Sequence, residues 1–246
     1  MKHILIIKTG STMPTLRQKR GDFEDWILTG MQSDKIEVTI LDVTKGTPLP
    51  SPEHLYGIVI TGSHAMVTEH QDWCEETAQW LRGSFEKQIP TLGICYGHQL
   101  LAYAAGGRVG NNPNGLEFGT VDVHLNEIAE KDPLFKDLPR TIQVHVSHTQ
   151  SIFNLPPGTR TLASNSMETH HAFVLGDCVW GMQFHPEFDA EITRAYIGEH
   201  REAILQEGNN TDRLIETCVD TPHGSRLLQQ FAAIVREKIK CRRKLY

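Results

Sequence analysis

Cys95 lies between Gly93 and Gly97, directly after an apolar run over residues 89–94. The run predicts a buried strand, and residues 99–105 predict a helix. A cysteine between these two elements would sit on a tight turn whose small neighbours leave its sulfur exposed to a substrate. Unpaired N–H groups at the start of a helix carry partial positive charge, which favours a thiolate beside them. We therefore predict that Cys95 is a nucleophile.

A thiolate nucleophile needs a general base, and His185 is the candidate. Residues 179–184 predict a strand that ends at His185. Pro186 restricts the backbone that follows, so that the Glu187 carboxylate can approach the same imidazole and orient it. Taken alone, His-Pro-Glu is typical of a strand end followed by a turn. Combined with the cysteine turn, it predicts a Cys-His-Glu triad.

These motifs resemble the class I glutamine amidotransferases, in which a Gly-x-Cys-x-Gly-(His)-Gln turn and a His-Pro-Glu segment complete a Cys-His-Glu triad. Two further segments occur in the family's order, residues 57–63 before the cysteine and residues 143–149 after it. Tyr96 and the Ser147-His148 pair are most similar to the amidotransferase domain of GMP synthase. The resemblance covers roughly residues 1–188, with a weaker echo over residues 224–231.

The resemblance implies hydrolysis of the glutamine side-chain amide, or of another γ-glutamyl bond, through a γ-glutamyl thioester on Cys95. His185 would pass a proton to the departing nitrogen, and Glu187 would hold His185. The implied substrate-binding residues are Gly62, Gln99, Ser147, His148 and Thr149.

The resemblance also implies an oxyanion hole, in which the backbone N–H groups of Tyr96 and Ser63 stabilise the negative oxygen formed during hydrolysis. Tyr96 follows the nucleophile at the helix start, where its N–H has no partner within the helix. Ser63 and His64 stand where the family usually has glycine and proline. This departure leaves the amide available but bears on the loop conformation, since a non-glycine residue at positive φ costs on the order of 1 kcal/mol.

Several histidines invite a metal assignment that the sequence does not favour. A strand would place His145 and His148 on opposite faces, and no carboxylate or cysteine lies near them in sequence. His64, His70 and the His170-His171 pair are expected to be surface or loop residues. No glycine-rich phosphate loop is visible either. We therefore expect neither a metal nor another cofactor.

Short apolar strands alternate with helical patterns in the first half of the chain, as in parallel βαβ units. Parallel sheets place active sites at the carboxyl ends of their strands, where Cys95, Ser63 and His185 would all fall. From residue 115, alternating strands predict an antiparallel extension. The expected strands span residues 4–7, 37–42, 57–61, 120–125, 141–146, 161–163 and 172–175, and the expected helices 22–31, 73–81, 189–210 and 225–240.

We therefore expect an α/β fold with a flavodoxin-like, mostly parallel central sheet flanked by helices, an antiparallel extension and a C-terminal helical element. Residues 1–188 would form the class I glutamine amidotransferase-like catalytic domain. Residues 189–246 would form a helical extension packed on the same domain, and they are too few for a second catalytic domain such as the ATP-using one of GMP synthases.

Charge and composition limit the kinds of partner and the compartment that we expect for this protein. The formal net charge is −6, which argues against nucleic acid, and the basic cluster over residues 238–244 is expected to be a solvated helix end. No apolar stretch is long enough for a signal peptide or a membrane helix. The five cysteines have no framework spacing, so we expect them to be reduced and the protein to be cytoplasmic.

Four functions remain open at this point. The first is a stand-alone hydrolase acting on a small-molecule substrate, glutamine or a γ-glutamyl compound. The second is a glutaminase subunit that delivers ammonia to a separate synthase chain, and the third is a γ-glutamyl peptidase. The fourth is a non-catalytic regulatory protein that shares the fold, because fold alone does not fix function.

Overall fold

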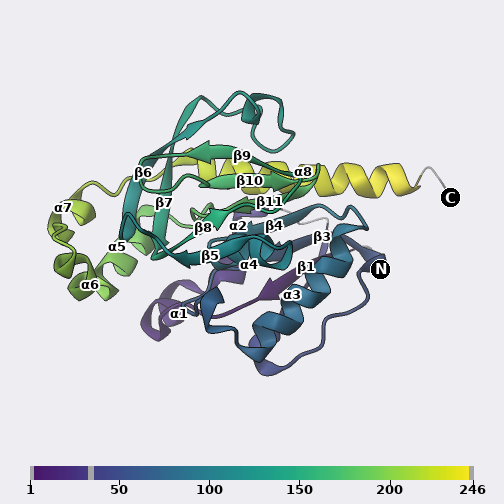
Figure 1. Ribbon diagram of the computed structural model, residues 1–246, viewed down its shortest axis with the longest axis horizontal. Helices are drawn as coiled ribbons and strands as arrows, with labels where there is room; N and C mark the ends of the chain where they lie inside the picture. Colours follow the sequence, from purple (N-terminus) through teal and green to yellow (C-terminus); the bar gives the residue numbers. More distant parts are fainter. Residues whose placement is uncertain (1–2, 33–35, 244–246) are drawn as a thin grey trace.

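A nine-stranded sheet runs through the computed structural model, which describes residues 3–32 and 36–243 (Figure 1). The strand order is β2-β1-β3-β4-β11-β10-β9-β6-β7. The first five strands run parallel in flavodoxin-like order. They are β1 (His3–Lys8), β2 (Glu37–Asp42), β3 (Leu55–Ile60), β4 (Thr91–Ile94) and β11 (Val179–Met182). The expected α/β fold is confirmed.

Antiparallel strands continue the sheet beyond β11, as the alternating patterns predicted. They are β10 (Ala172–Leu175), β9 (Thr159–Ser164), β6 (Glu117–Leu125) and β7 (Thr141–His148). A separate two-stranded sheet pairs β5 (Arg108–Asn111) with β8 (Gln150–Asn154). The sequence did not predict these two strands, because both are short and β5 is half-exposed with no clear alternation.

Helices cover both faces of the sheet. They are α1 (Pro14–Arg20), α2 (Phe23–Met31), α3 (Asp72–Phe85), α4 (Tyr96–Ala104), α5 (Ala190–Glu199), α6 (Arg201–Gln206), α7 (Thr211–Glu216) and α8 (Pro222–Arg243). Short 3-10 helices span Val43–Lys45, Pro52–His54, Val67–Glu69 and Ala129–Lys131. Figure 1 shows α5, α6 and α7 gathered at one end of the sheet, beside β6 and β7.

The helix predicted over residues 189–210 is divided, so that prediction was wrong in detail. His200 ends α5 with φ −95° and ψ 15°, and α6 begins at the next residue. The turn buries Ile204 against Phe118, Ile197 and Cys218 in a small apolar cluster of its own. Because burial of an aliphatic side chain contributes roughly 1.5–3 kcal/mol, this packing outweighs continuation of a single helix.

The C-terminal helix is part of the main hydrophobic core. Leu227, Leu228 and Phe231 of α8 are fully buried in the cluster that also contains Ile27 of α2. The helix lies so close to β3 that a Cβ on Gly57 would stand 2.8 Å from a methyl carbon of Val235. On the opposite face, α3 and α4 bury a second cluster. The segment after residue 188 therefore helps to hold the sheet that carries the site.

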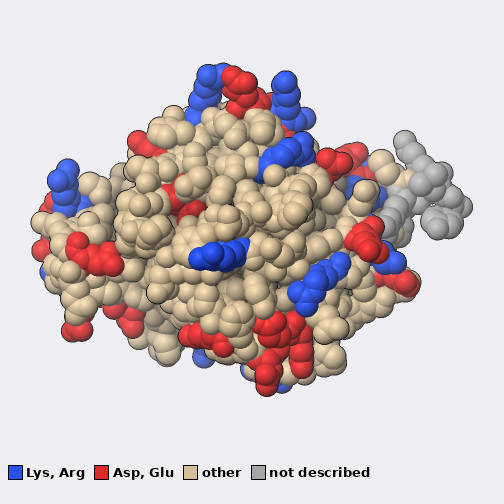
Figure 2. Space-filling view, viewed as in Figure 1, with Lys and Arg blue, Asp and Glu red and all other residues tan. Residues whose placement is uncertain are grey.

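The surface carries charges of both signs. On the face seen in Figure 2, Lys and Arg side chains stand apart from one another among acidic and uncharged residues. The basic cluster was predicted over residues 238–244. Helix α8 contains residues 238–243 of it, and Lys244 lies outside the described residues. Among the helices of the described ranges, none combines the length and apolar character that crossing a bilayer requires.

Candidate active site

Cys95 occupies a strained turn between β4 and α4. Its φ of 50° and ψ of −99° are unusual for a residue with a side chain, and such conformations cost about 1–3 kcal/mol. The flanking glycines make the turn possible. A Cβ on Gly93 would lie 2.4 Å from the Gly97 carbonyl oxygen, and a Cβ on Gly97 would lie 2.5 Å from that of Ile60. The Gly-x-Cys-x-Gly spacing therefore reflects close packing of the turn on β3.

Backbone contacts bring the His-Pro-Glu segment to this turn. The Cys95 N–H donates to the Met182 carbonyl at 2.8 Å, which aligns the turn with the end of β11. His185 then donates its own N–H to the His145 carbonyl at 2.8 Å. The His185 Nδ1 atom lies 2.8 Å from a Glu187 carboxylate oxygen, and the Cys95 side chain lies beside the same imidazole. The structure thus joins the three predicted triad residues in one chain of contacts.

The His185 imidazole is held in a charged, water-excluded setting. Its side chain and that of Glu187 are buried, and the ring of Phe188 stacks on it with centroids 3.9 Å apart. Burial opposes protonation, but the Glu187 carboxylate and the interaction with Cys95 outweigh it and raise the pKa of His185 to about 10. The imidazolium is therefore the stable form at neutral pH.

This environment predicts the pH dependence of the reaction. Because the pKa of His185 is raised to about 10, the proton needed by a departing nitrogen is retained until that pH, and kcat/KM should decline there rather than near 6.5. Glu187→Gln removes one of the charges that raise this pKa, so the decline should move to lower pH. The measurement is kcat/KM against pH for both proteins. Glu202→Gln, an exposed change of equal charge, is the control, and an unmoved decline in Glu187→Gln would contradict the assignment.

The two predicted oxyanion donors both line the same pocket as Cys95. Tyr96 is the first residue of α4, so its N–H has no partner within the helix. Ser63 follows the end of β3, and it does not adopt a positive φ. Serine in place of the family's glycine therefore carries none of the strain that the sequence raised as a concern. His64, expected to be a surface or loop residue, is exposed and also lines the pocket.

The pocket beside Cys95 has an empty volume of about 540 Å³, including its open mouth. Of the predicted substrate-binding residues, Gly62 contributes by close approach, since a Cβ there would lie 3.0 Å from the His185 ring. The others line the pocket directly: Gln99, Ser147, His148 and Thr149. The pocket thus gathers residues from three separate segments that the sequence had proposed.

Gln183 is a site residue that the sequence reading missed. Its side chain is fully buried, and its Nε2 donates to the Cys95 sulfur at 3.6 Å. Gln99 in turn donates to the Gln183 side-chain oxygen at 2.9 Å and to the Gln150 carbonyl at 3.1 Å. This relay ties the helix after the nucleophile to the strand before His185. The sequence did offer a signal, because the Gln183 side-chain amide stands at the end of an otherwise apolar strand.

His148 lies in a buried polar cluster whose members are far apart in the sequence. Its Nε2 is 2.8 Å from a Glu117 oxygen and its Nδ1 is 3.0 Å from the Gln150 carbonyl oxygen. His171, expected to be a surface or loop residue, lies in a loop but is fully buried, 3.2 Å from the same Glu117 oxygen, while Asn165 donates to the other at 2.7 Å. These residue types can ligate metals. No carboxylate lies close to His148 in the sequence, but β6 supplies that of Glu117.

Electrostatics explains how this cluster tolerates burial. Desolvation alone would raise the pKa of Glu117, but hydrogen bonds and charge from His148 and His171 hold it well below its usual range. The ionised carboxylate hydrogen-bonds His148 and Asn165 and lies beside the His171 ring, so it joins three segments. The cluster therefore fixes the residues just before and after Thr149, which face the pocket.

The outer wall of the pocket comes from α2 and from the segment after residue 188. His64 stacks on Tyr196 of α5 with centroids 5.6 Å apart and an interplanar angle of 3°. Phe23 of α2 lies near the His185 ring, at 6.1 Å between centroids.

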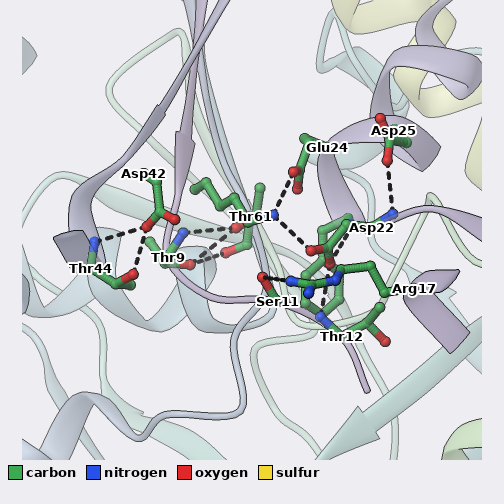
Figure 3. Close-up of polar contacts among 12 residues, drawn as sticks. Thr9, Ser11, Thr12, Arg17, Asp22, Glu24, Asp25, Asp42, Thr44 and Thr61 are labelled. Carbon is green, nitrogen blue, oxygen red and sulfur yellow. Dashed lines mark hydrogen bonds and ion pairs between the residues drawn. The ribbon is translucent and has the colours of Figure 1, made fainter. Parts of the chain in front are cut away.

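Figure 3 shows the contacts that hold the start of α2 in place. Asp22 accepts hydrogen bonds from the Lys8 ammonium at 2.7 Å and the Thr12 N–H at 2.8 Å, and it caps the helix.

Comparisons with known proteins agree with this architecture. The family model described as glutamine amidotransferase class-I matches residues 20–200. A Saccharomyces cerevisiae protein whose name places it among the glutamine amidotransferases is 28% identical over 74% of each chain. One subunit of a glutamine-hydrolysing GMP synthase from Pyrococcus abyssi is 36% identical over 53% of this chain and 65% of its own length, less than two thirds of that relative.

Structural comparison gives the same answer for the fold. The crystal structure of a glutamine amidotransferase from Thermotoga maritima superposes with a TM-score of 0.69 at 21% identity, covering 97% of both chains. At that identity the likeness shows a shared fold. The family model extends over most of the chain, and it includes both the cysteine turn and the His-Pro-Glu segment. This chain belongs to the class I glutamine amidotransferase family.

Proposed function

We propose that this chain hydrolyses the side-chain amide of glutamine, or another γ-glutamyl bond, through a thioester on Cys95. One observation supports this above the others. The Cys95 thiol, the His185 imidazole and the Glu187 carboxylate form a buried chain of contacts at a pocket with two candidate oxyanion donors. A non-catalytic protein of this fold would have no need of such a chain or of a strained nucleophile turn.

The proposed reaction has two halves. The Cys95 sulfur attacks the γ-carbonyl carbon, and the N–H groups of Ser63 and Tyr96 stabilise the oxygen that becomes negative. His185 gives its proton to the nitrogen, the C–N bond breaks and ammonia or an amine leaves. Water then loses a proton to His185 and attacks the thioester. The C–S bond breaks, glutamate leaves, and the thiolate and imidazolium are restored while Glu187 holds the ring.

The leaving group would face the wall built by His64 and Tyr196. That wall lies on the His185 side of the nucleophile, because the ring centroids of His185 and Tyr196 are 6.4 Å apart. A stacked aromatic surface can contact a leaving group larger than ammonia. This favours γ-glutamyl amides or peptides beside glutamine. The alternative is a glutaminase subunit with a synthase partner, which the name of the Pyrococcus relative favours.

These alternatives differ in the activity of the isolated chain. We expect the purified protein to release glutamate from at least one γ-glutamyl substrate without a partner, since uncoupled turnover is restrained only where ammonia must be channelled. The measurement is kcat/KM for glutamine and a set of γ-glutamyl dipeptides, with and without cell extract. Negligible rates alone, with strong activation of glutamine hydrolysis by an extract protein, would favour the synthase subunit. No turnover under either condition would favour the regulatory protein.

A further inference from the structure

The loop that carries the second oxyanion donor is held from behind by two buried threonines. Thr9 follows β1 and Thr61 follows β3, which are neighbours in the parallel sheet, and both side chains are fully buried. Figure 3 shows them facing each other. The Thr9 N–H donates to the Thr61 hydroxyl oxygen at 3.0 Å. The Thr61 hydroxyl therefore has its own proton free to donate elsewhere.

That proton goes to the carbonyl of Gly62. The Thr61 hydroxyl donates to the Gly62 oxygen at 3.0 Å. The Thr9 hydroxyl lies 3.1 Å from the same oxygen, 3.0 Å from the Thr61 carbonyl oxygen and 3.1 Å from the Thr61 hydroxyl oxygen, so its single proton has three acceptors within reach. Two hydroxyl groups with no competing solvent thus converge on one carbonyl. Hydrogen bonds in such buried positions are costly to leave unmade.

The direction of this carbonyl fixes the direction of the next amide. The Gly62–Ser63 peptide is trans, as are the other peptide bonds of the described residues, so its C=O and N–H point to opposite sides. The carbonyl points into the sheet, toward Thr9 and Thr61. Ser63 lines the pocket that contains Cys95 and His185.

We infer that Thr9 and Thr61 are positioning residues that lock the Gly62–Ser63 peptide with its N–H toward the pocket, so that the oxyanion hole is formed before any substrate or partner binds. The inference rests on the proposed hydrolase function. A peptide held this way cannot turn its carbonyl into the pocket without breaking both hydroxyl contacts. The lock would give the isolated chain its partner-free activity.

The test compares variants that delete or keep each hydroxyl. Thr9→Val and Thr61→Val should each lower kcat roughly 10-fold and the double variant roughly 100-fold, near the loss seen when one oxyanion donor is removed. KM should stay within about 3-fold, because the ground-state carbonyl depends less on the hole. Thr9→Ser keeps the hydroxyl and should therefore have a kcat close to that of the wild type. Thr77→Val removes another buried threonine hydroxyl, one that donates to the Trp73 carbonyl and does not line the pocket, and is the matched control.

A second measurement separates this inference from the proposed function. The γ-aldehyde analogue of glutamine should form a tetrahedral adduct with Cys95, and the lock should strengthen its binding whether or not turnover is observed. We expect its affinity to fall in parallel with kcat, while alkylation of Cys95 by iodoacetamide and thermal unfolding stay close to wild type. Thr61→Val serves if Thr9→Val does not fold. Wild-type affinity and kcat in folded valine variants would overturn the lock, whereas an inactive wild type that still binds the aldehyde would overturn only the hydrolase.

Discussion

Replacing Cys95 with serine should lower turnover by roughly 10⁴- to 10⁶-fold, because the covalent route is lost with the nucleophile. Serine keeps the size of the side chain and the strained turn, but its hydroxyl is a far weaker nucleophile than a thiolate beside an imidazolium. The measurement is glutamate release from the best substrate of the isolated chain. Thermal unfolding close to wild type would show that the fold is intact.

Chemical labelling provides an independent check on the same residue. A glutamine-shaped diazoketone should alkylate Cys95 selectively, and mass spectrometry identifies the modified cysteine. Cys178→Ser is the matched control, because this half-buried cysteine lies at the far end of β11 and should be dispensable. Labelling spread evenly over the other four cysteines, or full activity in Cys95→Ser, would contradict the nucleophile assignment.

His185→Ala should be almost as damaging as Cys95→Ser, since the same ring activates the thiol and protonates the departing nitrogen. Glu187→Gln should be roughly 10- to 100-fold less severe than His185→Ala. The carboxylate orients and charge-stabilises the imidazole but does not exchange the substrate's proton. The measurement is kcat for both variants under conditions where they remain folded.

The order of these two effects is the decisive result. His124→Ala, which removes an exposed imidazole from β6, controls for loss of a histidine as such and should retain wild-type activity. If a folded Glu187→Gln protein were as inactive as Cys95→Ser, the carboxylate would have a role beyond holding the ring. A fully active His185→Ala protein would remove the general base from the proposal altogether.

Local patterns in the sequence were sufficient to locate the parts of the candidate site. The Gly93-x-Cys95-x-Gly97 spacing encodes a turn between a buried strand and a helix, and a turn of this kind depends on neighbours within a few residues. The parallel sheet then follows from the alternation of strands and helices. Parallel strands bring their carboxyl ends to one edge, which is why residues 63, 95 and 185 could be expected together.

The contacts that complete the site were decided by tertiary structure. His171 reads as a loop residue in the sequence, yet it is fully buried beside Glu117. The C-terminal segment was expected to pack on the domain, but its Tyr196 forms a wall of the pocket. None of these side chains belongs to a helix or strand periodicity that would predict its burial or its place in the pocket. Their positions depend on which strands become neighbours.

The threonine lock shows the same division most clearly. Thr9 and Gly62 are 53 residues apart, and they meet only because β1 and β3 pair with one particular register. The sequence determined the nucleophile turn, the order of the motifs and the class of fold, because helix and strand periodicity and glycine geometry act over a few residues. Tertiary structure decided which buried polar groups satisfy one another, because a buried donor must take whichever acceptor the packed strands place within about 3 Å.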